Sequence, residues 1–205
     1  MSALSEIIRR IDDIEAWQDA QKVQGRRQPE FGHILMRPAA GVFVGNLLTG
    51  TLTTLASAAN RVDITPFMPR VSFTIDQIGL SVSTAAAGSA CGLIFDTDIN
   101  GRPTTILAQG DNVDTGAVAT VMGAVSFTFR AGKLYYVGGW TQAACTLRCG
   151  QTYTQVPLSW TNAATPARQA VLRRTQAWGG AATNWVYAVG QHTTASAPFV
   201  LMRVA

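Results

Sequence analysis

The stretch VSFTIDQIGLSVS at residues 71–83 decides the fold class of this chain, because its apolar and polar residues alternate. Apolar side chains occupy every second position of Val71–Ile75 and again of Ile78–Val82. A period of two places the apolar side chains on one face of a β-strand and the polar ones on the other. The sequence therefore predicts a long strand that buries one face.

Shorter stretches with strand character follow at the spacing of an all-β domain, and turn-forming residues separate them. We expect a jelly-roll-like β-sandwich over residues 69–205, with a long excursion at about 150–196. Within this excursion, Ala167–Gln176 is expected to form a short helix and Trp185–Val189 a strand. The other expected strands are Ala90–Phe95, Thr105–Ala108, Ala117–Met122, Val125–Phe129, Leu134–Gly138, Cys145–Cys149 and Ala197–Val204.

The first 23 residues follow a helical period instead. Leu4, Ile7, Ile11 and Ile14 are spaced three or four residues apart, which is the a/d seam of a coiled coil. Leucine or isoleucine at the a positions with isoleucine at the d positions favours coiled coils of three or four helices over coiled coils of two. We therefore expect a helical trimerisation stalk over residues 1–23 and a linker arm with one or two strands over 24–68. The alternative is an ordinary amphipathic helix that packs on its own domain.

Composition excludes several classes of protein. Of the 205 residues 47% are hydrophobic and only 14% are charged, which is unlike a disordered chain. No apolar run reaches the roughly 18 residues of a membrane span, so membrane insertion is not expected. The basic residues are scattered, so nucleic acid is not an expected partner. Acidic residues near the N-terminus are unlike a secretory signal, which predicts synthesis in the cytoplasm.

The sequence predicts no catalytic residues, no metal site and no cofactor. Asp96–Gly101 copies the first six positions of a calcium-binding EF-hand loop, but Leu107 stands where that loop needs glutamate. A hairpin turn explains these residues better, because Asn-Gly is a favoured turn dipeptide. Motifs of serine hydrolases and zinc proteases are missing, and no acidic residue follows Asp114. The cysteines Cys91, Cys145 and Cys149 are expected to be small buried residues.

A binding role is better supported by the second half of the chain, which combines basic and aromatic residues without acids. Aromatic rings suit the apolar faces of sugars, and arginine pairs with carboxylate or phosphate. This favours an anionic polysaccharide as ligand. The alternative is that the rings fill the sandwich or an interface between copies while the arginines are solvated. The candidate glycan-binding residues are Trp160, Trp178, Trp185, Tyr187, Arg173 and Arg174.

Residues 54–140 carry an order of features that resembles the β-sandwich module of bacteriophage fibre and virion-appendage proteins. The matching residues are Pro66–Phe67, Thr84–Ser89, Asp98–Pro103, Ile106–Ala108 and Ala131–Tyr135. The resemblance implies a homotrimer with an N-terminal helical stalk, which agrees with the heptad pattern. It covers less than half of the chain, and the large shaft and baseplate-docking regions of long fibres have no counterpart, which points to a short head, neck or tail fibre.

Together these features predict a structural virion fibre protein, made in the host cytoplasm, that is not an enzyme. Its N-terminal helix is expected to dock on a capsid, portal, neck or tail protein, and its head on host-surface polysaccharide. One alternative is a capsid decoration protein that stabilises the phage head. Another alternative is a glycan depolymerase. The lack of a clear pair of carboxylates argues against this activity.

Overall fold

The structure, a computed structural model, describes residues 38–46, 52–150, 171–193 and 196–205. The chain divides into two units, Met1–Ile34 and Leu35–Ala205, and every described residue belongs to the second. The predicted stalk with its seam Leu4, Ile7, Ile11 and Ile14 therefore lies outside the described residues, as does Trp160.

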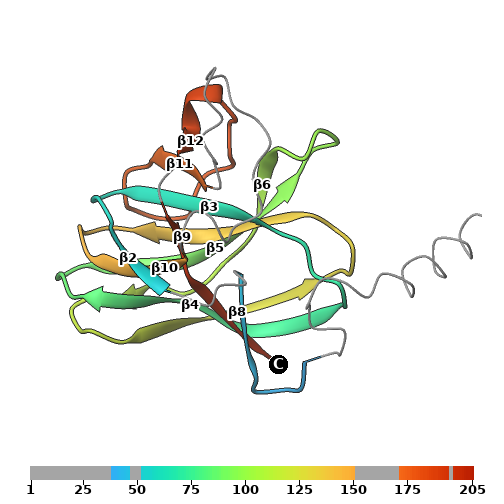
Figure 1. The fold of residues 1–205 in the computed structure, drawn as a ribbon, viewed down its shortest axis with the longest axis horizontal. Coiled ribbons are helices and arrows are strands. Elements are labelled where there is room, and N and C mark those ends of the chain that lie inside the picture. The colour runs from blue at the N-terminus through green and yellow to red at the C-terminus, as the bar shows by residue number, and fades with distance from the viewer. Residues whose placement is uncertain (1–37, 47–51, 151–170, 194–195) are drawn as a thin grey trace, which may run out of the picture. The chain divides into compact units, whose positions relative to one another are not determined.

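The second unit is mainly β, with two antiparallel sheets packed face to face (Figure 1). In the first sheet β4 lies between β14 and β8, and β1 pairs with β14. The remaining strands of this sheet, β2, β10 and β13, join through β10. The bounds of its strands are β1 Phe43–Gly45, β2 Leu52–Ala56, β4 Phe73–Thr84, β8 Thr120–Phe129, β10 Thr146–Gly150, β13 Ala197–Pro198 and β14 Val200–Val204.

The second sheet has the strand order β12-β11-β3-β9-β5-β6, with the short β7 also paired to β5. Figure 1 shows β11 and β12 beside β3, at one end of this sheet. A 3-10 turn over Val189–Gln191 precedes β12. The bounds of its strands are β3 Arg61–Phe67, β5 Ser89–Thr97, β6 Pro103–Gln109, β7 Val113–Asp114, β9 Tyr135–Thr141, β11 Val171–Thr175 and β12 His192–Thr193.

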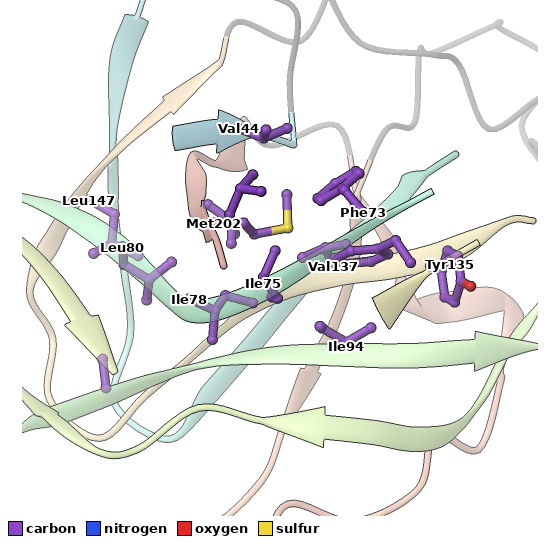
Figure 2. Close-up of a cluster of buried hydrophobic side chains, with 14 of the residues drawn as sticks. Val44, Phe73, Ile75, Ile78, Leu80, Ile94, Tyr135, Val137, Leu147 and Met202 are labelled. Atoms are coloured by element: carbon purple, nitrogen blue, oxygen red, sulfur yellow. The ribbon is translucent and has the colours of Figure 1, made fainter. Parts of the chain in front are cut away.

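The long strand predicted from residues 71–83 is confirmed as β4. Its apolar side chains change phase between Ile75 and Ile78, and the structure explains this by an irregularity in the pairing with β14, where Gln77 pairs with Arg203 but Ile75 with Val204. A β-bulge of this kind inserts an extra residue and returns the following side chains to the same face. Both halves of β4 therefore point into one core, where Figure 2 shows them gathered with Ile94 and Val137 of the second sheet.

A second core covers the opposite face of the second sheet. Trp140, Tyr136 and Leu172 are buried there, together with Trp185 from the segment after β11. All seven residues of β9 are buried, because this strand is covered on both faces. The segment of the predicted excursion that follows β11 therefore forms a layer that covers this face of the second sheet.

Two local expectations for the excursion are wrong. Val171–Thr175 is strand β11 and not part of a helix, because it pairs with β3 and buries Val171 and Leu172 completely. Long-range pairing here outweighs the local helix signal at Thr165-Pro166. Trp185–Val189 is not a strand, although the Trp185 N–H donates to the carbonyl oxygen of Thr104 at 2.6 Å, on the edge of β6.

The interval expected to be a linker arm contributes more regular structure than one or two strands. Its described part holds β1, β2 and β3. β1 and β2 belong to the first sheet and β3 to the second. This part of the chain is therefore built into the sandwich.

Close backbone packing makes Gly138 a sensitive position. A Cβ atom there would lie 2.0 Å from the carbonyl oxygen of Asp63 on the neighbouring strand β3. We expect Gly138→Ala to lower the free energy of unfolding by about 1–3 kcal/mol, since overpacking forces the strands apart. Urea denaturation measures this. Gly190→Ala is the control, because nothing lies within 4 Å of its added Cβ; equal losses in both variants would contradict the expectation.

Candidate functional site

Four of the five described candidate residues gather on the outer face of the second sheet, whereas Arg173 points to the opposite face of β11, toward Asp63. Arg173 and Arg174 lie on β11, while Trp178, Trp185 and Tyr187 lie in the segment that follows it. The structure thus brings together residues that the sequence selected only by type. What each side chain contacts decides which of them a ligand can reach.

Trp185 is part of the core, with only 4% of its surface exposed. Its ring meets that of Phe95 edge to face, with centroids 5.6 Å apart. Its Nε1–H donates to Oε1 of Gln191 at 2.9 Å, so the polar end of the ring is also engaged. Trp178 is half-buried and packs against Trp140 at a centroid distance of 4.6 Å.

Arg174 fastens the covering segment to the sheet. Its guanidinium lies over the Trp185 ring at 4.6 Å and donates to the carbonyl oxygens of Thr183 and Asn184 at 2.6 and 2.8 Å. Burial lowers the pKa of Arg174. Its cation is thus held by backbone dipoles and ring faces, and its contacts are those of a structural clamp.

Arg173 belongs to a buried ion cluster. Its Nε lies 2.6 Å from Oδ1 of Asp63, and Nε of Arg61 lies 2.8 Å from Oδ2 of the same carboxylate. Asp63 is only 4% exposed. Burial lowers the pKa of Arg61 even though Asp63 opposes this. One carboxylate therefore compensates two guanidiniums in a poorly solvated place, and Arg173 is engaged by it.

The solvent-accessible part of this face is a small patch that we call the Tyr187 surface, formed by Ile99, Arg102, Val186 and Tyr187. The Arg102 guanidinium lies 4.9 Å from the centre of the Tyr187 ring. Ile99 is 100% exposed and Val186 79%. Sequence reasoning missed Ile99 and Arg102 because they read only as turn residues; their exposure beside Tyr187 depends on the fold.

Both carboxylates of the turn at residues 96–101 are already bound by other groups of this chain. Oδ1 of Asp98 accepts the N–H groups of Asn100 and Arg102, each at 2.8 Å. Asp96 forms an ion pair with Lys133 at 2.8 Å. Within the described ranges no group of three or more His, Cys, Asp or Glu side chains is placed to hold a metal ion. The hairpin-turn interpretation is thus the one that the contacts support.

The ion pair of Asp96 gives a titration prediction. Burial would raise the pKa of this carboxyl, but hydrogen bonds from Lys133 and the Thr97 N–H, with the charge of Lys133, lower it below its ordinary 3.8. The carboxylate therefore stabilises the fold above pH 3.8, and this contribution is lost as pH falls through the lower folded pKa. We expect Lys133→Met to raise the pKa of Asp96 in an NMR titration. An unchanged pKa would show that Lys133 does not stabilise the carboxylate.

The cysteines and the hollows offer no reactive group in the part of the chain that the structure describes. All three thiols are free and buried, and burial raises the pKa of Cys91 to about 12. A hollow at one end of the first sheet has no ionisable side chain in its lining. It is lined by Pro38, Ala39, Ala40, Thr74, Val204 and Ala205.

No protein-family model and no curated protein sequence matches this chain. Among the described residues there is no helix long and apolar enough to cross a membrane. The assignment of function therefore rests on the fold and on the surfaces described above.

Proposed function

We propose that this chain is a structural virion fibre protein whose jelly-roll head projects from an N-terminal trimerising segment. The strand order carries the proposal. Within the two seven-stranded sheets, the order β1-β14-β4-β8 faces the order β3-β9-β5-β6, and eight strands in two facing sheets are the core of the jelly roll of viral capsid and lectin domains. The heptad seam at Leu4–Ile14 adds the expectation of three copies.

The head contacts host-surface polysaccharide at the Tyr187 surface. Val186 precedes Tyr187 and Ile99 lies in the same turn as Arg102, and both apolar side chains are exposed; Arg102, over the Tyr187 ring, adds a cation that pairs with an acidic sugar. Trp185 and Arg174 lie behind this surface and Arg173 pairs with Asp63 on the other face of the sheet, so the contacts of all three are with the domain itself. Several weak sites on one particle supply avidity, so that a single site of low affinity suffices.

Labelling of host cells by the purified full chain tests the glycan contact. Tyr187→Ala is expected to lose labelling, whereas Tyr187→Phe keeps the ring and retains labelling; because Tyr187 packs partly on the second core, melting curves check that both variants are folded at the temperature of the assay. The glycan contact would be refuted if Tyr187→Ala labelled host cells as strongly as the unchanged protein. It would also be refuted if the unchanged protein gave no labelling at high micromolar concentration.

Imaging of particles that carry a labelled copy tests the virion role. Labels clustered at vertices, neck or tail are expected for a fibre. Labels at the local threefold positions throughout the capsid would instead identify a decoration protein, and particles without label would refute both roles.

A further inference from the structure

The two sheets differ in what covers their outer faces. The segment after β11 covers the outer face of the second sheet. On the first sheet, β8 presents Ala124, Ser126 and Thr128 as exposed residues, and Phe43 of β1 is 52% exposed. No other described strand packs on this outer face of β1, β14, β4 and β8, which we call the first-sheet face.

Four polar side chains of the first-sheet face are already paired with one another. Arg203 binds Asp76 through two hydrogen bonds of 2.8 and 2.7 Å. The hydroxyls of Thr74 and Thr128 lie 2.9 Å apart. A partner surface covering these groups would leave none of them without a hydrogen bond, which removes the main cost of burying a polar face.

The face is also electrically neutral and partly apolar. Its one acidic and one basic side chain, Asp76 and Arg203, cancel each other's charge. Phe43 and Leu201 add apolar area, and Met122 lies over Gly79, where an added Cβ would come within 2.6 Å of its sulfur. A neutral face repels neither a second copy of itself nor an apolar side chain of that copy.

The connection of the chain favours another copy as the occupant. The described residues begin at Pro38, directly before the edge strand β1 of this same sheet. If residues 4–14 associate as proposed, the covalent connection keeps the heads of all copies at high effective concentration. The hollow lined by Ala40, Thr74 and Val204 lies at the end of this sheet and offers a place for a neighbour's side chain.

We propose that the first-sheet face is the surface through which the heads of copies of this chain contact one another. The inference rests on the proposed association of the N-terminal segments. It assigns the interface to β1, β14, β4 and β8 and leaves the Tyr187 surface, on the other sheet, free for a ligand.

Thiol accessibility in the assembled full chain tests this interface. Ser126→Cys places a thiol on the first-sheet face, and Thr105→Cys places one on β6 of the other sheet, both at exposed positions. The native cysteines are buried, so the protein without either substitution gives the background rate of alkylation. We expect alkylation at position 126 to be roughly tenfold slower than at 105, as for a site that is open about a tenth of the time. Adding Ala124→Arg should restore fast alkylation at 126.

Light scattering on the same samples separates the possible failures. A trimer mass with equal alkylation rates would overturn the interface while leaving the proposed association intact. A single-chain mass with equal rates would overturn both. A single-chain mass with slow alkylation at 126 would also overturn the inference, because another segment of the same chain would then cover the face.

Discussion

Trp185→Ala is expected to lower the free energy of unfolding by about 3–5 kcal/mol, the usual cost of truncating a buried tryptophan. The ring is only 4% exposed and fills the space between Phe95 and the Arg174 guanidinium. Its loss leaves a cavity and also leaves the hydrogen-bond acceptor Gln191 without its indole donor. The covering segment after β11 should loosen as a consequence.

Urea denaturation of Trp185→Ala measures this loss, and Val186→Ala is the matched control. Val186 is the next residue but 79% exposed, so its truncation should change stability by no more than about 0.5 kcal/mol. If Trp185→Ala kept full stability and lost cell labelling, the ring would belong to the ligand surface and its structural assignment would be wrong.

Asp63→Ala is expected to cost about 3–5 kcal/mol, because it leaves the nearly buried guanidinium of Arg61 and the half-buried one of Arg173 without their shared carboxylate. The side chain of Arg61 is only 10% exposed, so water replaces the lost partner poorly. Both the midpoint of urea unfolding and the melting temperature should fall.

The control for Asp63→Ala is Lys133→Met, which removes one partner of the more exposed pair with Asp96. At that site both side chains remain partly solvated, with 40% and 29% of their surfaces exposed, so little stability should be lost. Similar effects of the two substitutions would contradict the view that burial makes the Asp63 cluster important.

The part of the fold that depends on local alternation could be predicted from the sequence. The pattern of residues 71–83 predicts β4, and the change of phase in that pattern coincides with the bulge beside Gln77 in the pairing with β14. β11 could not be predicted in this way, because its strand conformation depends on pairing with β3, about a hundred residues earlier in the chain.

The candidate site shows a similar division. Residue type alone marked Trp178, Trp185 and Tyr187 as candidate binding residues. It could not separate core residues from binding residues, because packing and sugar binding both favour aromatic side chains. Only the covering of the second sheet decides that Trp185 is buried while the Tyr187 ring stays near the surface. Arg102 reaches that ring from a hairpin far away in the sequence, which no local pattern could reveal.

The most direct test of the account is the mass of the purified full chain by light scattering, checked by chemical crosslinking. The account predicts three times the chain mass of 21.8 kDa, and loss of this assembly when Ile7 and Ile11 are both replaced by lysine. A mass of one chain, in free protein and on assembled particles alike, would contradict it.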